Sequence, residues 1–538
     1  MASGSGYRGI VWVLVLVSVG CSDNGSGTSS GNSNSISATG TPVTHSTTTA
    51  TSSGPNTSSG GAPTTSSVTS VATTGGSGGS NSGGSAGSDA GSMGGLAGAD
   101  TTGTTGETVE GDTCSFTLSH TRSTAIGTVQ IVSWSTDLSN VTEAHIDFGL
   151  TDSELSTNAP VDLEEPDYRT LLLGMKGDRS YSFRIVASSA DQTCTGPELS
   201  FMTGPVPEWV PTISKGPSLL DAAKGFIVTT SGLGLLTRDR NLPSVFIFDT
   251  DGDVVWWTPE VIQDAAGARM SWDGKTMYFV NAYPADVFGI SMDGMTSWEI
   301  PELAGANHDL TVLPDGGIVT MVSNGVSEPF SIVELQSDGT VVSIVDDLST
   351  LYTTETFHPN AIHYYPADNS FTLSDLNLNG FVKFTRDGEL LWQLGGSNPL
   401  GDSFELVGLE PWLANHGHHL TSDGSFLFFN NFTDAANSGP STVFEVQLNE
   451  DDWIAAESWQ YRGDGNRTSL QLGDVERLPN GNALITYSNE ARIVEVGISG
   501  EELQSFKNDM FLPEGTSSPV ALFGYASFRS SLYGPPPR

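Results

Sequence analysis

Basic residues are scarce in this sequence. Of its 538 residues, 21 are Lys or Arg and 62 are Asp or Glu, so the formal net charge is −41. Such a chain has no electrostatic attraction for nucleic-acid phosphates or for anionic lipid surfaces, which excludes a nucleic-acid partner and docking through a basic patch. Any anionic ligand must be held by local donors against the overall charge.

Long hydrophobic runs are scarce as well. The run from Ile10 to Val17, which follows Arg8, is much shorter than the roughly 20 residues that a membrane-spanning helix needs, and no later segment is long enough. A basic residue before a short apolar run is typical of a secretory signal. Gly20-Cys21 resembles the cleavage site of a bacterial lipoprotein. We therefore interpret residues 1–21 as a lipoprotein-type signal peptide and expect an exported protein, periplasmic or at the cell surface, with a lipid on Cys21 that anchors it to a membrane. Cleavage without lipidation is the alternative.

Residues 22–113 lack Lys and Arg and consist mostly of Ser, Thr and Gly. A segment of this composition cannot bury a hydrophobic core. We expect it to be a disordered linker that separates the anchor from the folded domains.

Residues 114–205 contain short alternating runs separated by turn residues, a pattern typical of a β-sandwich. Residues 173–184 resemble the late hairpin of fibronectin type III domains, in which a tyrosine, here Tyr181, locks the next strand. Trp134 is the expected core aromatic. Because Cys21 is expected to carry the lipid, Cys114 and Cys194 remain to form a disulfide in an exported chain, with two free thiols as the alternative. We expect a structural or adhesive role for this domain.

Residues 216–538 repeat a unit of a β run, a tight turn and a second β run. Asp-Gly occurs at 251–252, 273–274, 293–294, 315–316, 338–339, 387–388 and 423–424, and Asn480-Gly481 extends the series. These dipeptides favour the positive backbone dihedrals of tight hairpins. Six copies of about 54 residues each fit the four-stranded blades of a propeller. The sequence therefore predicts an all-β protein with a six-bladed β-propeller after the sandwich.

Histidines occupy one position of this repeat. Eight residues before the turn glycine lie Ala266, His308, His416 and Gly473, and the variant copy has His358 at the matching point. In a propeller the innermost strand of each blade lines the central channel, so the three histidines of consecutive copies converge at one end of it. If these histidines stabilised the repeat, a histidine would be expected at this position in every copy, but the other copies have Ala266 and Gly473. They are the candidate functional site.

Several segments that contain these histidines resemble the arylsulfate sulfotransferase family. They are "ANHDLTVLPDGGIVTM", "FHPNAIHYYPADNSFTLSD", "NHGHHLTSDGSFLFFNNF" and "GDVERLPNGNALITYS". The resemblance implies an exported enzyme that moves a sulfuryl group from an aryl sulfate ester to a phenolic acceptor, without a cofactor. It implies that His416 is the nucleophile and forms a sulfo-histidine, that His308 and His358 bind the sulfuryl oxygens and handle the phenol proton, and that Asn360 binds substrate. A neutral imidazole, whose ordinary pKa is about 6.5, suits this chemistry near pH 7.

The sequence departs from the family at one position. Where the family has an arginine in a Ser-Ser-Arg context, this chain has Ser374-Asp375-Leu376-Asn377. Arg467 or Arg492 is a possible substitute from another blade. The alternative to an enzyme is a catalytically inactive propeller that binds ligands at the cell surface.

A metal site is the other competing interpretation. His416 and His418 would share one face of a strand and, with His308 or His358, could bind zinc. No cysteine joins this group, and the sequence has no His-Glu-x-x-His motif. We therefore expect no metal, and we expect hydrogen-bonding roles for His363, His418 and His419.

Overall fold

The computed structural model describes residues 104–232, 244–259, 265–282, 285–323, 325, 330–410, 412–432, 439–509 and 523–536. The predictions for the signal peptide, for Cys21 and for most of the linker lie outside these residues. The described residues form strands and four short 3₁₀ turns, namely η1 (Pro166–Tyr168), η2 (Pro301–Leu303), η3 (Leu348–Thr350) and η4 (Ser488–Glu490). The predicted all-β class is confirmed. Within the described part of the chain, no helix has the length and apolar character to cross a membrane.

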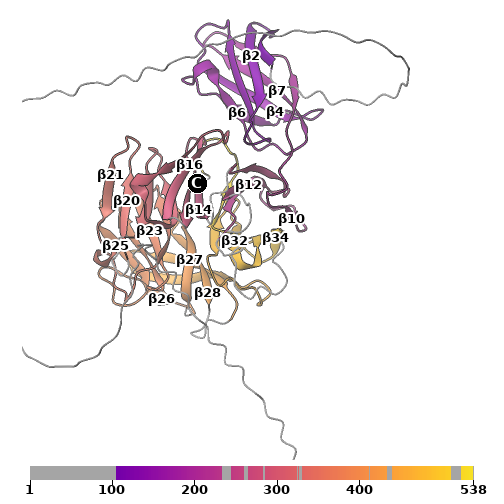
Figure 1. Cartoon of the computed structure of the whole chain (residues 1–538). Helices are drawn as coiled ribbons and strands as arrows, with labels where there is room; N and C mark the ends of the chain where they lie inside the picture. The colour runs from indigo at the N-terminus through magenta and orange to yellow at the C-terminus, as the bar shows by residue number, and fades with distance from the viewer. Residues whose placement is uncertain are drawn as a thin grey trace, which may run out of the picture. The chain divides into compact units, whose positions relative to one another are not determined.

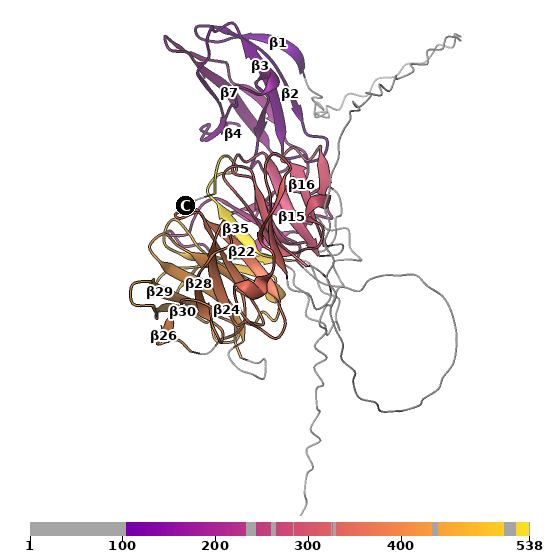
Figure 2. The same ribbon diagram turned by 90° about the vertical axis from the view of Figure 1, so that its left-hand side faces the viewer.

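Two sheets form the first folded region (Figures 1 and 2). One contains β1 (Thr104–Glu110), β2 (Ser115–Arg122), β3 (Gln130–Thr136) and β6 (Thr170–Leu172). The other contains β5 (Thr157–Pro160), β4 (Glu143–Leu150), β7 (Ser180–Ser188), β8 (Thr193–Thr195) and β9 (Leu199–Met202). Trp134 is 2% exposed between them, which confirms it as a core residue. The backbone N–H of Lys176 donates to the Tyr181 hydroxyl at 2.9 Å, so this tyrosine holds the turn before its own strand. The resemblance to fibronectin type III domains stays a prediction.

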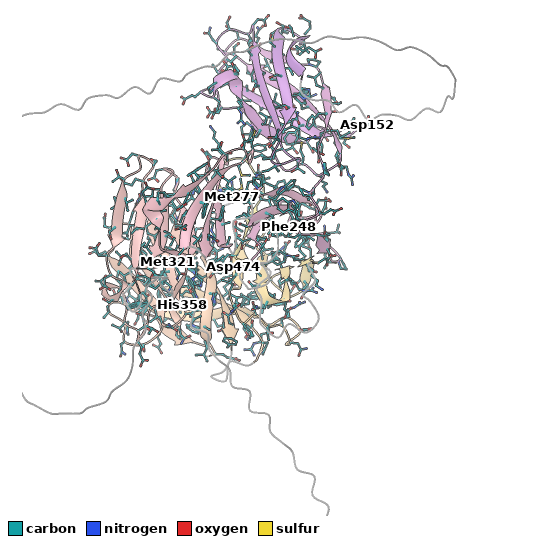
Figure 3. All side chains as sticks on the ribbon, viewed as in Figure 1. Asp152, Phe248, Met277, Met321, His358 and Asp474 are labelled. Atoms are coloured by element: carbon teal, nitrogen blue, oxygen red, sulfur yellow. A yellow bond between two sulfur atoms is a disulfide. The ribbon has the colours of Figure 1, made fainter. Side chains whose placement is uncertain are left out.

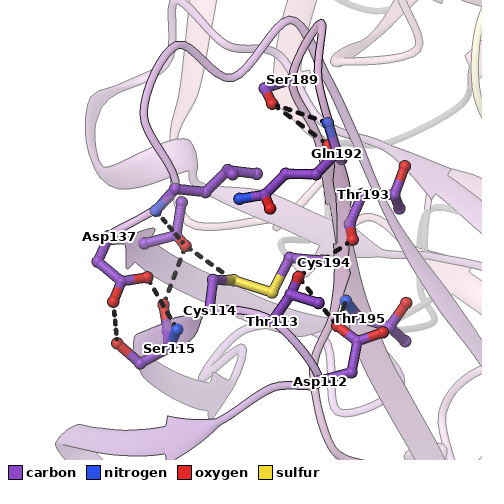
Figure 4. The surroundings of a disulfide bond; sticks show 12 residues. Asp112, Thr113, Cys114, Ser115, Asp137, Ser189, Gln192, Thr193, Cys194 and Thr195 are labelled. Carbon is purple, nitrogen blue, oxygen red and sulfur yellow. Dashed lines mark hydrogen bonds between the residues drawn. A yellow bond between two sulfur atoms is a disulfide. The ribbon is translucent and has the colours of Figure 1, made fainter.

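The start of this sandwich differs from the prediction. Residues 104–110, assigned to the linker, form β1, which pairs with β2 in antiparallel register. Thr and Val in this segment favour an extended strand. The strand is stabilised by its hydrogen bonds to β2, and the Ser/Thr/Gly composition of the segment does not reveal this pairing. Cys114 and Cys194 are joined by a disulfide in the structure, with Cα atoms 5.9 Å apart (Figure 4).

Six sheets follow, which we call blades 1 to 6, and we name the strands of each blade from the innermost outward. Blade 1 contains β35 (Ala526–Arg529), β11 (Phe226–Thr230), β12 (Val245–Asp249) and β13 (Val254–Trp257). Blade 2 contains β14 (Ala265–Met270), β15 (Thr276–Ala282), β16 (Ala285–Ser291) and β17 (Ser297–Ile300). Blade 3 contains β18 (Ala306–Val312), β19 (Ile318–Val322), β20 (Ser331–Leu335) and β21 (Val341–Val345).

The other three blades continue in chain order. Blade 4 contains β22 (Pro359–Tyr365), β23 (Ser370–Asp375), β24 (Gly380–Thr385) and β25 (Leu390–Gly395). Blade 5 contains β27 (Leu413–Leu420), β28 (Ser425–Phe432), β29 (Thr442–Asn449), β30 (Ile454–Tyr461) and β26 (Glu405–Val407). Blade 6 contains β31 (Asp474–Arg477), β32 (Ala483–Tyr487), β33 (Arg492–Val496), β34 (Glu502–Asn508) and β10 (Ile213–Lys215). Successive innermost strands contact one another around a closed ring.

The ring closes through two strands that lie far from their partners in the sequence. β10 adds an outer strand to blade 6, so the propeller begins before residue 216, the predicted boundary. β35, labelled in Figure 2, supplies the innermost strand of blade 1. It pairs with β11, as in Phe226↔Arg529. Both strands are only three or four residues long and lack a hairpin turn to a partner. The repeat of Asp-Gly turns therefore gives no sign of them.

The predicted turns and cores are present in the blades. Gly274, Gly316 and Gly424 have φ of 73°, 86° and 83°, the left-handed conformation that glycine adopts without steric cost. Hydrophobic side chains fill the space between neighbouring blades. Phe248 of blade 1 and Met277 of blade 2, labelled in Figure 3, belong to one such cluster and are fully buried.

The sandwich contacts blades 1 and 2. Its Ile126, Val129 and Leu173 belong to the same buried cluster as Phe248 and Met277. The Nζ atom of Lys176 lies 3.2, 2.8 and 2.8 Å from carboxylate oxygens of three aspartates at the turn between β12 and β13: Asp249, Asp251 and Asp253. Apolar packing and ion pairs together hold the two regions against each other.

Candidate active site

Each innermost strand of blades 2 to 5 has an irregular register at the repeat position that carries the candidate histidines. The shifts lie between Ala265 and Ala268, between Ala306 and Leu310, between Pro359 and Ala361, and between Asn415 and His418. An extra residue at such a bulge redirects a side chain and ends regular pairing. His308 itself has φ of 61°, and Ala414, two residues before His416, has the same φ. The bulges of blades 3 and 5 therefore present His308 and His416 in directions that a regular strand would not. His358 differs from the prediction: it lies one residue before β22, and eight residues before the left-handed turn residue Asn369 lies Ala361, which packs with Ala266 of blade 2.

The structure brings His308, His358 and His416 together from three consecutive blades. The ring centroids of His308 and His358 lie 5.1 Å apart in an edge-to-face arrangement. His308 is close enough to both other rings for their positive forms to repel its own. Burial first, and then His358 and His416, hold the pKa of His308 well below its ordinary value. The imidazole of His308 is therefore neutral at pH 7. Figure 3 labels His358 within the propeller.

His416 is 4% exposed and is held by its Nδ1 atom. Nδ1 lies 2.7 Å from Oδ1 of Asn431 on β28 and 3.3 Å from the carbonyl oxygen of Ala414. Burial lowers the pKa of His416 to about 4, and repulsion from His358 acts in the same direction, while the bond to Asn431 opposes it. The imidazole is consequently neutral across the physiological range.

His308 has a similar partner on its own strand. Its Nδ1 atom lies 2.7 Å from Oδ1 of Asn307, whose Nδ2 atom donates to the carbonyl of Pro359 at 3.4 Å. The side-chain amide of Asn307 thus links His308 to β22, the strand that directly follows His358.

His358 differs from the other two because a carboxylate lies near it. Oδ2 of Asp375 accepts the backbone N–H of His358 and the hydroxyl of Tyr352, both at 2.8 Å, and Oδ1 accepts backbone N–H groups of Asn377 and Leu378. Burial lowers the pKa of His358, whereas the charge of Asp375 raises it. Of the three histidines, His358 is the one whose protonated form is stabilised by an anion.

Asn360 is fully buried, and its side chain contacts the next blade. The Nδ2 atom of Asn360 donates to the backbone carbonyl of Asn415 at 2.7 Å. The backbone carbonyl of Asn360 accepts the Tyr525 hydroxyl at 2.5 Å. Oδ1 of Asn360 has no hydrogen-bond partner among the described residues. The amide nitrogen therefore joins β22 to the strand that carries His416.

The arginines proposed as substitutes have other partners. Arg467 lies 3.5 Å from Glu490 and 2.5 Å from Glu502, and its guanidinium stacks on Tyr487. Arg492 begins β33, the third strand of its blade. At the predicted arginine position, Leu376 donates its backbone N–H to the carbonyl of His358. Within the described ranges, no hydrogen bond or ion pair joins an arginine to the three histidines.

The other histidines lie further along the same strands. The ring of His363 stacks on that of His418 at 4.6 Å, Nε2 of His418 lies 2.8 Å from the Thr372 hydroxyl, and Nδ1 of His419 accepts the backbone N–H of Arg477. His416 and His418 thus have separate partners. In the part of the chain that the structure describes, no three His, Cys, Asp or Glu side chains form a group that could hold a metal ion.

Buried charged residues lie on the same innermost strands. Arg269 contacts Asp309 at 3.2 Å, and Oδ2 of Asp309 accepts the backbone N–H of Ile362 in the next blade. In blade 6, Oδ2 of Asp474 accepts the N–H of Ala526 at 3.1 Å and Oε2 of Glu476 accepts the N–H of Phe528 at 2.8 Å. Two carboxylates therefore bind the closing strand β35.

These carboxylates are costly to ionise. Burial raises the pKa of Asp474 to about 8, with further contributions from Asp309 and Glu476, while Arg269 opposes the shift. Burial also raises the pKa of Glu476 to about 7 and that of Asp309 to about 6. Gly417 lies directly against Asp474, where a Cβ atom would clash with its carboxylate. Figure 3 labels Asp474 within the propeller.

The fold and the histidine cluster define a β-propeller with a candidate active site at the innermost strands. A family model described as arylsulfotransferase (ASST) matches residues 212–509, which is more than half of the chain. The chain belongs to the arylsulfotransferase family. None of the curated proteins compared matches the sequence.

Two solved structures illustrate the similarity that the comparison detects. Virginiamycin B lyase from Staphylococcus aureus is 15% identical, with a TM-score of 0.31, over 45% of this chain and 69% of the other. TolB from Acinetobacter baumannii is 13% identical, with a TM-score of 0.38, over 66% of this chain and 80% of the other. At these values the similarity carries no information about substrate or activity.

Sequence reasoning missed Asn431, Asn307 and Asp375. A signal for Asn431 exists in the repeat, since it lies seven residues after the turn glycine, where the other copies have Asn281, Ser323 and Ser488. Ser488 also contacts the start of its innermost strand, because its hydroxyl accepts the N–H of Gly473. Asp375 lies beside the missing arginine, but the sequence does not show that its carboxylate lies near His358.

Proposed function

We propose that the protein transfers a sulfuryl group from an aryl sulfate ester to a phenolic acceptor through a sulfo-histidine on His416. The observation that carries this proposal is a buried, neutral His416 with two further histidines nearby, in a chain of the arylsulfotransferase family. A neutral imidazole has a lone pair for attack on sulfur, and a covalent intermediate divides the transfer into two easier steps.

In the first step, Nε2 of His416 forms a bond to sulfur while the bond between sulfur and the aryl oxygen breaks. The electron pair of that bond leaves with the oxygen, which takes a proton from the imidazolium form of His358 and leaves that ring neutral. We assign the proton to His358 because Asp375 stabilises its charged form. To donate to the sulfuryl oxygens, His308 must carry a second proton on Nε2, because its Nδ1–H faces Oδ1 of Asn307.

In the second step, the acceptor phenol gives its proton to His358 and its oxygen attacks sulfur. The bond between sulfur and Nε2 breaks, and its electron pair returns to His416. Protons and charges balance over the two steps, with His358 as the proton carrier in both. General acid–base catalysis of this kind contributes about 10²- to 10⁴-fold.

The donor in this proposal is a small aryl sulfate, and the acceptor is a phenol. Asn360 contributes its unpartnered Oδ1 atom, which can accept a hydrogen bond from the hydroxyl of the phenol but not from the sulfuryl oxygens. With the arginine position filled by Leu376, the sulfuryl oxygens depend on histidine donors alone, so we expect weak binding of the donor and a high KM.

The cellular setting is also part of the proposal. Export through the signal peptide, a lipid on Cys21 and the disulfide between Cys114 and Cys194 place the enzyme at a membrane surface in an oxidising compartment. Metabolic labelling with a fatty acid checks the anchor: wild type should incorporate the label, and Cys21→Ser should not. Label in Cys21→Ser would contradict lipidation at this residue.

The test of the activity is release of a coloured phenol from an aryl sulfate, with and without an added phenol. We expect release that the acceptor stimulates, its loss in His416→Ala, and its retention in His145→Ala, whose histidine lies in the sandwich. A protein that binds the aryl sulfate but releases nothing across a panel of donors would instead be the inactive binding propeller.

A further inference from the structure

The side chain of Asn431 lies between the imidazole of His416 and two backbone carbonyls. Asn431 is on β28 and is fully buried. Its Nδ2 atom donates to the carbonyl oxygens of Ser469 at 2.6 Å and of Leu472 at 2.9 Å. Carbonyl oxygens only accept hydrogen bonds, so the amide nitrogen must face them. The opposite orientation of the amide would leave its oxygen against two acceptors.

This orientation of the amide determines which atom of Asn431 faces the imidazole of His416. Oδ1 of Asn431 faces Nδ1 of His416 at 2.7 Å, and the carbonyl oxygen of Ala414 lies 3.3 Å from the same nitrogen. Both neighbours are acceptors, so Nδ1 must carry the proton. A neutral imidazole has a single N–H, and the hydrogen bond made by one ring nitrogen sets the state of the other. The lone pair is therefore on Nε2.

We propose that Asn431 is a positioning residue that fixes the Nδ1–H tautomer of His416 and so directs the lone pair of Nε2 to the sulfur. This inference rests on the proposed function. It assigns to Asn431 a task that neither the repeat nor the family match gives it.

An amide suits this task better than a carboxylate. A carboxylate partner would stabilise the imidazolium, whereas Asn431 orients the ring while burial keeps it neutral. When Nε2 bonds to sulfur, the ring gains positive charge, and a hydrogen bond donated by a charged group is stronger than one from a neutral group. The bond to Asn431 is therefore stronger in the sulfo-histidine than in the free enzyme.

Blade 2 provides an internal comparison. At the same two repeat positions it has Ala266 and Asn281 instead of His416 and Asn431. Asn281 is 2% exposed, and its Oδ1 atom has no hydrogen-bond partner among the described residues. Asn281→Leu is thus a matched control, because it removes the same amide from a blade without the histidine.

The experiment combines ¹⁵N NMR of histidine-labelled protein with steady-state kinetics. Wild type should show His416 with a proton on Nδ1, and Asn281→Leu should leave this signal and kcat unchanged. In Asn431→Leu we expect a shift toward Nε2–H and a kcat lower by about 10- to 100-fold, with KM changed less than about twofold. In Asn431→Asp, a side-chain oxygen still accepts from Nδ1, so the tautomer should persist and the acidic limb of the pH profile should move to higher pH.

Two results would overturn the inference: a proton on Nε2 of His416 in wild type, or an Asn431→Leu protein that keeps both the tautomer and kcat. The wild-type spectrum decides the question even if Asn431→Leu does not fold. A failure of the proposed function is distinguishable, because it appears as absence of turnover in wild type while the NMR result still reports the tautomer.

Discussion

The buried carboxyl group of Asp474 should make the stability of the propeller depend on pH. Its pKa is raised from 3.8 to about 8 by burial in the folded protein. Between these two values the folded protein holds one proton that the unfolded chain has released. The stabilisation is complete below the unfolded pKa and is lost as the pH rises to about 8. One proton corresponds to about 1.4 kcal/mol of unfolding free energy per pH unit, or about 3 kcal/mol between pH 5.5 and 7.5.

Asp474→Asn removes this proton while it keeps an oxygen for the N–H of Ala526. The new amide also meets the backbone N–H of Val475, which now donates to the carboxylate at 2.9 Å, so a constant loss of about 1 kcal/mol accompanies the change. Urea unfolding at pH 5.5, 6.5 and 7.5 should give a dependence on pH that is shallower than in wild type by about 1.4 kcal/mol per unit.

The histidines titrate in both proteins and cancel in the difference. Asp338→Asn, at an exposed turn, should differ from wild type by the same amount at each pH. Parallel curves for Asp474→Asn and wild type would refute the argument that Asp474 is protonated in the fold.

Three further predictions concern other parts of the molecule. The acidic limb of kcat/KM should lie near pH 4, not near 6.5, because burial lowers the pKa of His416 to about 4; a pH profile with a limb near 6.5 would show an ordinary, exposed imidazole. Lys176→Met should lower the thermal unfolding temperature more than Lys224→Met, since Lys176 lies within 3.2 Å of three aspartates and Lys224 is 71% exposed; equal effects would contradict a structural role for this contact. Replacing Cys114 and Cys194 by serine should destabilise the sandwich by about 2–4 kcal/mol in calorimetry and leave sulfuryl transfer intact, and loss of transfer would show that the propeller depends on the sandwich.

The local repeat explains why much of the fold is predictable. Each Asp-Gly turn fixes a hairpin, and the hairpins recur at the spacing of blades, so the innermost strands of blades 2 to 6 could be found by counting. The same counting found His308 and His416, which share a position relative to a local turn. His358 lies eleven residues before Asn369, the left-handed residue of its turn, so the segment around it and not the count identified it.

Ring closure and the partners of the histidines are not predictable in this way. β10 and β35 pair with strands about 290 to 300 residues away and have no turn signal of their own. The oxygen of Asn431 faces His416 because the backbone carbonyls of Ser469 and Leu472 bind the amide nitrogen. The sequence around Asn431 does not predict these two contacts. Pairing across blades is a property of the closed ring and not of any one repeat.

The central claim is that sulfur bonds to His416, and rapid quenching of the enzyme with an aryl sulfate, without acceptor, tests it most directly. Peptide mass spectrometry under mild alkaline conditions should find a sulfo group on the peptide that contains His416, and fragmentation should place it on that residue. Addition of a phenol before quenching should remove it, and His416→Ala should not form it. A turnover-competent enzyme with no adduct on His416, or with the sulfo group on His308 or His358, would contradict the account.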